Sequence, residues 1–122
     1  MKNKQLNLAV GRLGEKLARE YLQKKGYKIL EQNYRTRYAE IDLVAKRKDV
    51  LVFVEVRTKV GEQFGTPEET LNFYKLKKVR QNAAAYAAHV RWDKLYRIDA
   101  VCIVLGENHA LQRIAHYENI KS

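Results

Sequence analysis

Three acidic residues stand in a stretch that otherwise reads as two buried β-strands. The stretch 39–59 is AEIDLVAKRKDVLVFVEVRTK, and its acids are Glu40, Asp42 and Glu55. If these strands form a hairpin whose turn is centred on residues 48–49, opposed residue numbers sum to 97, so Asp42 faces Glu55. Opposed side chains on one face of such a pair have Cβ atoms about 4.5–5.5 Å apart, and like charges there are destabilising.

Two facing carboxylates with apolar neighbours must share a proton, pair with cations or bind a metal ion. Mg²⁺ suits such a pair, because it prefers oxygen ligands and is commonly held by one or two carboxylates plus substrate phosphates. Mn²⁺ accepts the same ligands. An ion of this kind activates water and neutralises charge during phosphodiester hydrolysis. The alternative is a solvated hairpin whose acids pair with Arg57 and Lys59.

The same register divides the hairpin into two faces and sets Glu40 against Arg57. The polar face carries Glu40, Asp42, Phe53, Glu55, Arg57 and Lys59. The other face is apolar and carries Ile41, Leu43, Val52, Val54 and Val56. The acids are therefore organised on one side of the hairpin.

The elements that must position this hairpin follow from periodicity. Apolar residues at helical spacing predict a first helix over 6–25, whose Gly11 and Gly14 suggest a close approach to another backbone. Glu15 borders the apolar side of this helix. Strands are expected over 27–35, 39–46, 49–59, 96–105 and 113–117. With a second helix, described next, the pattern predicts an α/β or α+β fold of order αβββαββ around one central mixed sheet.

The second helix has a strong start signal in Thr66-Pro67-Glu68-Glu69. The pattern predicts Thr66 as N-cap, proline at the first helical position and Glu69 closing a capping box, with the helix running to about His89. Its first half is basic and could lie along a phosphate backbone, although a solvated helix face explains the spacing equally well. These basic residues are Lys75, Lys77, Lys78 and Arg80.

The charge balance points to a polyanionic partner. The 122 residues include 24 Lys and Arg against 14 Asp and Glu, a formal net charge of +10. Nucleic acid is the commonest partner of such a chain, and a basic protein whose charge only keeps it in solution is the alternative. Arg35 and Arg37 are further candidates for phosphate contacts. Tyr34 and Tyr38 beside them could stack on unpaired bases, unless they are ordinary core or surface residues.

Length and cysteine content set the remaining bounds. A chain of 122 residues is sufficient for one core but not for two, so residues 1–122 are expected to form one domain. The only cysteine, Cys102, excludes a disulfide framework. The N-terminus has no apolar run long enough for a signal peptide or a membrane span, so we expect a cytoplasmic protein without a membrane partner.

Asp99 is expected to pair with Arg97 or a basic helix residue, and the histidines show no metal-ligand spacing.

The order of the motifs resembles a known nuclease pattern. A helix glutamate, then Asp, then Glu-x-Lys on the next strand is the signature of the PD-(D/E)XK nuclease superfamily. More closely, five segments in order resemble the YraN-type family, which is similar to archaeal-type Holliday junction resolvases. They are GRLGEKLAREYLQKKGY, NYRTRYAEIDLVAK, VFVEVRTK, QFGTPEE and YRIDAVCIV. The resemblance covers nearly the whole chain and implies a restriction-endonuclease-like fold, branched DNA as substrate and a homodimer.

The resemblance also assigns roles to residues. In the superfamily the Asp and the Glu bind magnesium together with the carbonyl of the residue after the Glu, which here are Asp42, Glu55 and Val56. The helix glutamate, here Glu15, often assists a metal-bound water. The resemblance therefore implies a Mg²⁺-dependent DNA endonuclease.

Two positions depart from the pattern. The family usually has glycine where this chain has Ala39, and the superfamily lysine is replaced by Arg57. Arginine cannot accept a proton, but it can bind the scissile phosphate through two hydrogen bonds. Lys59 lies two residues on and about 6.6 Å away on the same face. It could supply the missing amine, although a solvated lysine at the end of the strand explains it better. The replacement also leaves two alternatives open, a non-catalytic nucleic-acid-binding protein with the nuclease fold and a module that binds an acidic protein.

Overall fold

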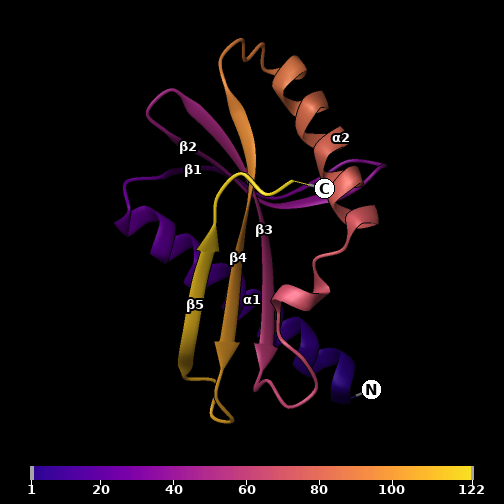
Figure 1. Cartoon of the computed structure of the whole chain (residues 1–122), viewed down its shortest axis with the longest axis vertical. Helices are drawn as coiled ribbons and strands as arrows, with labels where there is room; N and C mark the ends of the chain where they lie inside the picture. Colours follow the sequence, from indigo (N-terminus) through magenta and orange to yellow (C-terminus); the bar gives the residue numbers. More distant parts are fainter. Residues whose placement is uncertain (1, 122) are drawn as a thin grey trace.

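The computed structural model describes residues 2–121, which form two helices and a five-stranded sheet of order β1-β2-β3-β4-β5 (Figure 1). In chain order the elements are α1 (Lys2–Lys24), β1 (Lys28–Arg35), β2 (Glu40–Arg47), β3 (Val50–Val60), the 3₁₀ turn η1 (Glu68–Thr70), α2 (Phe73–His89), β4 (Tyr96–Leu105) and β5 (Leu111–Tyr117). β3 and β4 are parallel, and the other neighbours are antiparallel. The predicted α+β class, element order and mixed sheet are confirmed.

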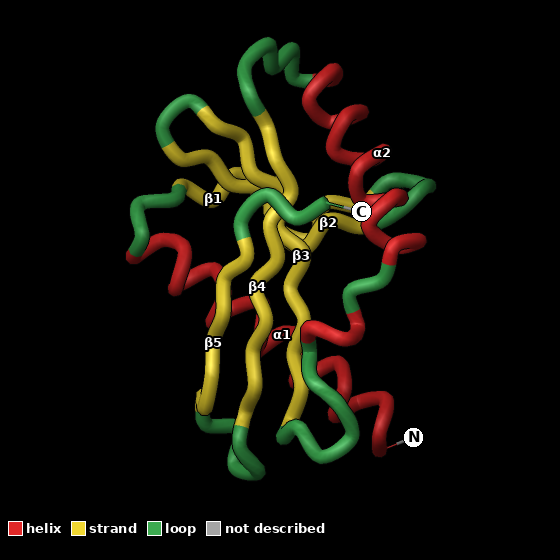
Figure 2. Tube along the Cα trace, viewed as in Figure 1, coloured by secondary structure: helices red, strands yellow, loops and turns green. Residues whose placement is uncertain are grey.

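The parallel pair explains why α2 lies against the sheet. Parallel strands need a crossover connection, and the chain makes it by leaving β3 through η1, running along α2 and entering β4 (Figure 2).

No helix within residues 2–121 has the length and apolar character that crossing a membrane requires.

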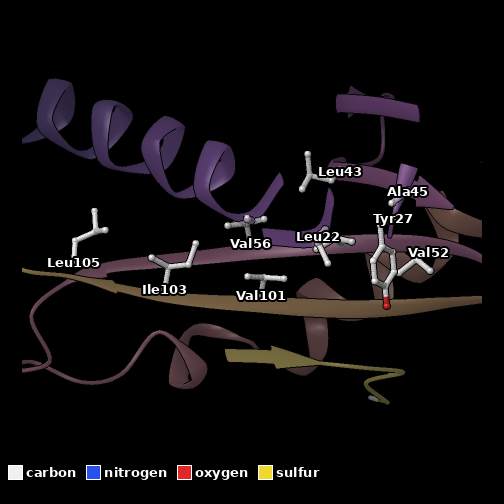
Figure 3. Packing of buried hydrophobic residues seen from close by; sticks show 11 residues of the cluster. Leu22, Tyr27, Leu43, Ala45, Val52, Val56, Val101, Ile103 and Leu105 are labelled. Carbon is white, nitrogen blue, oxygen red and sulfur yellow. The ribbon is translucent and has the colours of Figure 1, made fainter. Parts of the chain in front are cut away.

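The helices cover opposite faces of the sheet, because alternate residues of β3 face opposite ways. On the α1 face, Leu22 packs with Val52, Val56 and other buried strand residues (Figure 3). On the α2 face, Phe53 packs with Val79 and further buried residues of α2. The apolar hairpin face predicted from the sequence is confirmed except at one position. Ile41 packs in the α2-side cluster rather than with Leu43, because β2 and β3 stop pairing next to it.

Gly14 and Gly11 have different roles in α1. A Cβ on Gly14 would collide with the Thr58 side chain of β3, whereas a Cβ on Gly11 would meet nothing within 4 Å. The predicted close approach is therefore confirmed at Gly14, against a side chain, and is wrong at Gly11.

This difference gives a paired prediction for helix α1. Gly14→Ala is expected to destabilise the fold by about 1–3 kcal/mol through overpacking. Gly11→Ala is expected to stabilise it by up to about 1 kcal/mol through helix propensity. Urea unfolding of the two variants measures both signs. Equal effects would show that α1 does not lie against Thr58 as the structure has it.

The predicted start of the second helix is wrong by six residues, because the N-cap is Asn72 and not Thr66. Thr66 Oγ1 accepts a hydrogen bond from the Glu69 N–H at 3.3 Å, but only the short η1 turn follows. Leu71 is extended, and Asn72 caps α2 by accepting from the Lys75 N–H at 2.8 Å. Asparagine is a strong N-cap, so Asn72 was a second start signal in the sequence.

Contacts from β5 hold the η1 turn in place. Arg113 donates two hydrogen bonds to Glu68, at 2.6 and 2.9 Å, and the Tyr117 hydroxyl donates a third at 2.7 Å. Arg113 also pairs with Glu62 at 3.2 Å. We call these residues the Glu68–Arg113 clamp, because they hold the β3–α2 connection against the sheet.

The clamp predicts a pH-dependent contribution to stability. Hydrogen bonds from Arg113 lower the pKa of Glu68 to about 2. Because this folded-state pKa lies below the unfolded one, the stabilisation is present above about pH 4.5 and is lost as the pH falls towards 2. Glu68→Gln is therefore expected to cost about 1–2 kcal/mol at pH 7, after allowance for solvent screening, and much less near pH 2. Thermal unfolding at both pH values, with Glu69→Gln as control, checks the difference.

Candidate functional site

The β2–β3 ladder has the predicted register and ends beside the acids. Its pairs run from Arg47–Val50 to Leu43–Val54, and each sums to 97. Beyond the last pair, the Asp42 carboxylate takes over as acceptor, because its Oδ2 receives the Val56 N–H at 2.7 Å. This bond holds the Asp42 side chain against β3 next to Glu55.

The predicted Glu40–Arg57 pairing is wrong, since the ladder does not extend that far. Glu40 instead lies opposite Arg35 in β1 and forms an ion pair with it at 3.0 Å. Its other oxygen accepts from Asn33 Nδ2 at 3.0 Å. The Glu40 carboxylate is therefore held by β1.

The surroundings of Asp42 favour the protonated form of its carboxyl. Burial raises the pKa of its carboxyl most, the Glu55 charge adds to this, and the Val56 hydrogen bond opposes it, leaving the pKa at about 8. A carboxyl that ionises near pH 8 beside a second carboxylate releases its proton readily when a cation arrives.

Glu55 is the most enclosed acid of the site, with 2% of its surface exposed. Its Oε1 forms ion pairs with Lys75 at 3.0 Å and with Arg57 at 3.2 Å. Its Oε2 and the Arg57 Nε are buried side-chain atoms for which residues 2–121 supply no hydrogen-bond partner. A buried oxygen without a partner costs about 1–3 kcal/mol, and such atoms mark functional sites or bound ions.

Lys75 also belongs to this site, a position that its spacing in the sequence does not predict. The spacing on the second helix grouped it with the phosphate-binding candidates, but the structure turns its ammonium towards buried Glu55. The Asn72 cap sets the phase of α2 and makes Lys75 its third residue. The correct N-cap would have placed Lys75 on the first turn, facing the end of β3.

Glu15 reaches the same region from α1. Its Oε1 accepts from Asn33 Nδ2 at 2.8 Å, and its charge contributes to the raised pKa of Asp42. Glu15, Val56 and Arg57 also line one hollow of about 250 Å³. Lys59 lies further along β3 and lines the adjoining hollow. The structure thus brings the predicted Glu15, Asp42, Glu55, Val56 and Arg57 to one place, with Lys59 beside it.

The remaining basic candidates lie on α2 and on the β1–β2 turn. Lys77 and Arg80 are exposed, and Lys78 lies 4.6 Å from the centre of the Tyr74 ring. Arg35 is tied to Glu40, whereas Arg37 is exposed and stacks on Tyr38 at 4.9 Å.

Buried Asn82 joins these two groups. Its side chain accepts from the Thr36 hydroxyl at 2.7 Å and donates to the Ala39 carbonyl at 2.8 Å, which fixes the β1–β2 turn beside α2 (Figure 1). The turn and the helix therefore present their basic residues side by side.

Asp99 lies in a second ionic cluster, where it pairs with Arg97 at 2.9 Å as predicted. Asp99, His116 and Glu118 bring three potential ligand atoms within 4.8 Å of one another. Arg97 already donates to Asp99 and approaches Glu118 at 3.5 Å. Lys25 lies 2.9 Å from His116 Nδ1, so the other ring nitrogen carries the proton towards Asp99. The guanidinium supplies the cation here, and the cluster is structural.

The fold and the site define the class: an α+β protein with a restriction-endonuclease-like arrangement of two helices on a mixed five-stranded sheet. Buried Glu55 and partly buried Asp42 lie where its hairpin opens. The chain belongs to the Uncharacterised protein family UPF0102, whose profile matches residues 14–103. The predicted YraN-type family is thereby confirmed.

Three relatives illustrate the match. The UPF0102 protein of Caldanaerobacter subterraneus subsp. tengcongensis is 41% identical over 112 residues, which cover 90% of this chain and 92% of that protein. The UPF0102 protein of Alkaliphilus oremlandii is 40% identical over 119 residues, or 93% and 98% of the two chains. That of Caldicellulosiruptor bescii is 48% identical over 105 residues, or 82% and 87%.

The residues present fit a hard divalent cation. The donors are carboxylate oxygens, which Mg²⁺ and Mn²⁺ prefer. The Glu55 Oε2 atom lacks a partner among the described residues, and adjacent Asp42 has a proton to exchange for an ion.

Proposed function

We propose that this protein is a Mg²⁺-dependent endonuclease that hydrolyses phosphodiester bonds in branched DNA. The observation that carries the proposal is the unpartnered, buried Glu55 Oε2 beside Asp42, whose pKa is raised to about 8. Two carboxyls arranged in this way favour a shared proton or a cation between them. The net charge of +10 suits a polyanionic substrate.

Asp42, Glu55 and the carbonyl of Val56 would hold the Mg²⁺ or Mn²⁺ ion. When bound, the ion supplies Lewis-acid activation of water and neutralises charge on the phosphate. Asp42 is already oriented by the Val56 N–H at 2.7 Å, and it gives up its proton on binding.

The other side chains of the site would bind the phosphate group and orient water. Arg57 has a buried Nε without a partner and can donate to a phosphate oxygen together with its terminal nitrogens. Lys75 adds a second positive charge at Glu55, which favours a transition state that carries more negative charge than the substrate. Glu15 faces the hollow it shares with Arg57 and can accept a hydrogen bond from water.

The basic surface would hold the rest of the substrate. Lys77, Lys78, Arg80, Arg35 and Arg37 lie on α2 and on the turn that Asn82 fixes beside it. Such contacts position DNA without reading its sequence, in keeping with recognition of a branched shape. A homodimer would supply the two sites that paired nicks across a junction require.

Cleavage of supercoiled DNA and of a four-way junction, with Mg²⁺ and with EDTA, tests the proposal. Wild type is expected to cut in Mg²⁺ and not in EDTA. Binding to both DNAs is expected to weaken as salt rises, because phosphate contacts release counterions. If no substrate is cut with Mg²⁺ or Mn²⁺ while salt-dependent binding persists in EDTA, the enzyme assignment is wrong.

A second function, nucleic-acid binding without cleavage, is favoured by one observation. Glu55 already pairs with two cations, Arg57 and Lys75, so part of its charge is neutralised without a metal ion. Calorimetric titration with Mg²⁺ separates the two functions, since a binding module would show no heat of binding at this site.

A further inference from the structure

Phe64 is more exposed than any other large apolar side chain that the structure describes, at 93%. It lies in the loop between β3 and η1, flanked by Gly61 (φ 70°) and Gly65 (φ 115°), both in a conformation that favours glycine. The Glu68–Arg113 clamp holds the end of this loop against β5. An aromatic ring is thus displayed to solvent by an anchored loop.

Phe64 stands at the end of a groove that begins at the proposed active site. The hollow of about 250 Å³ that contains Glu15 and Arg57 adjoins one of about 260 Å³ that contains Phe64. The two share Asn7, Val10 and Thr58 as walls, so they form one passage, which we call the α1–β3 groove.

Gly11 keeps the α1–β3 groove open, because no atom lies within 4 Å of the position its Cβ would take. Along β3, Arg57 and Gly61 are four residues apart, or about 13 Å at the rise of a strand. At the rise of about 3.4 Å that one strand has in a duplex, this span takes at most about four nucleotides, and fewer if the unpaired strand is extended. The groove is therefore long enough for a short run of nucleotides between the proposed site and Phe64.

The charges along the α1–β3 groove indicate what kind of molecule binds there. Arg57 and Lys59 line it, and Glu15 at the proposed site is the one acid among its wall residues in the described part of the chain. The hollow on the other side of the Phe64 loop contains Glu62 and Glu107 instead. A phosphate backbone therefore fits the α1–β3 groove better than the hollow beyond it.

We propose that the α1–β3 groove takes an unpaired DNA strand next to the scissile phosphate and that one of its bases stacks on Phe64. This inference rests on the proposed function and narrows its substrate class to DNA with a single-stranded segment beside the cut. Unpaired bases have free faces for an aromatic ring, whereas bases inside a duplex are stacked on both sides. Stacking of this kind tolerates any base sequence.

Binding in EDTA tests the groove independently of cleavage. Full-length wild type, Phe64→Ala and Phe64→Trp are titrated with a blunt duplex, the same duplex with a six-nucleotide overhang, and a single strand. Phe64→Ala is expected to weaken binding of the overhang and the single strand about 10- to 100-fold and of the blunt duplex less than about twofold. Phe64→Trp is expected to retain binding.

Two further variants test whether the loss of binding is specific to the α1–β3 groove. Gly11→Leu fills the groove without touching Phe64 and should reproduce the loss on the overhang, while its helix propensity preserves α1. Leu95→Ala removes another side chain that is 76% exposed, beside the start of β4 and a full strand length from Phe64, and should change nothing.

The proposal is overturned if Phe64→Ala has no effect, if it weakens duplex and overhang equally, or if Leu95→Ala matches it. Tighter binding of an RNA strand with the same dependence on Phe64 would overturn the choice of DNA. If the selective loss is found but wild type cuts nothing in Mg²⁺, the groove assignment stands and the nuclease proposal fails.

Discussion

Asp42→Asn is expected to lower cleavage by at least about 10³-fold, because loss of a carboxylate ligand removes several kcal/mol of metal-ion stabilisation at about 1.4 kcal/mol per tenfold in rate. The asparagine side-chain oxygen can still accept the Val56 N–H, so the hairpin should keep its shape. Steady-state cleavage of a branched DNA in Mg²⁺ measures the loss. The matched control is Asp49→Asn, an exposed turn acid whose side chain is 79% accessible and pairs only with Lys94 among the described residues.

The same substitution is expected to stabilise the metal-free protein at alkaline pH. The folded-state pKa of Asp42, about 8, lies above the ordinary aspartate value of 3.8. Stability from the protonated carboxyl is therefore fully present below about pH 4 and is lost as the pH rises through 8. The asparagine side chain cannot ionise. At about pH 8.5, Asp42→Asn should therefore unfold at a higher temperature than wild type, and its free energy of unfolding should be larger by about 2–4 kcal/mol.

Mg²⁺ should reverse the order of the unfolding temperatures of wild type and Asp42→Asn. Ion binding to the folded state stabilises it by mass action, so Mg²⁺ is expected to raise the unfolding temperature of wild type at about pH 8 and not that of Asp42→Asn. Because binding displaces a proton, Mg²⁺ affinity should weaken about tenfold per pH unit below about 8. If Mg²⁺ leaves the wild-type unfolding temperature unchanged, or shifts that of Asp42→Asn equally, Asp42 is not a ligand.

The register of the hairpin was predictable because it depends on local chemistry. The length of the turn sets which residues face each other, and the sum of 97 follows for every pair from Leu43–Val54 to Arg47–Val50. The end of the ladder was not predictable. It depends on the Asp42 carboxylate replacing a backbone acceptor at Val56, and on β1 holding Glu40 through Arg35. These contacts join residues whose distance in space the sequence does not show.

The position of Lys75 shows a second feature that could not be predicted from the sequence. Helical spacing places lysines relative to one another, but only the helix start says which of them faces the sheet. The signal at Thr66 was stronger in the sequence than the one at Asn72, yet only the short turn η1 follows Thr66, and Arg113 and Tyr117 of the last strand hold its Glu68. These contacts with the last strand are tertiary, and helical spacing does not show them.

Lys75→Ala is expected to lower cleavage about 10²- to 10³-fold, as does loss of one preorganised group that stabilises transition-state charge. The effect should fall on kcat, because the ammonium of Lys75, although its side chain is 43% exposed, is held at the buried Glu55. Lys75→Arg keeps the charge and should retain most activity. Lys77→Ala, two residues on and exposed, should change KM and its salt dependence and leave kcat within about threefold.

Metal affinity gives Lys75→Ala a signature that a DNA contact would not have. Removing the ammonium leaves Glu55 with Arg57 as its remaining ion-pair partner among the described residues, so the site becomes more negative and Mg²⁺ should bind more tightly although cleavage falls. A phosphate-contacting lysine would weaken DNA binding and leave Mg²⁺ affinity unchanged. If Lys75→Ala and Lys77→Ala behave alike in both measurements, Lys75 contacts the DNA backbone. If they differ as expected, Lys75 acts at Glu55 beside Arg57 and not on the DNA backbone.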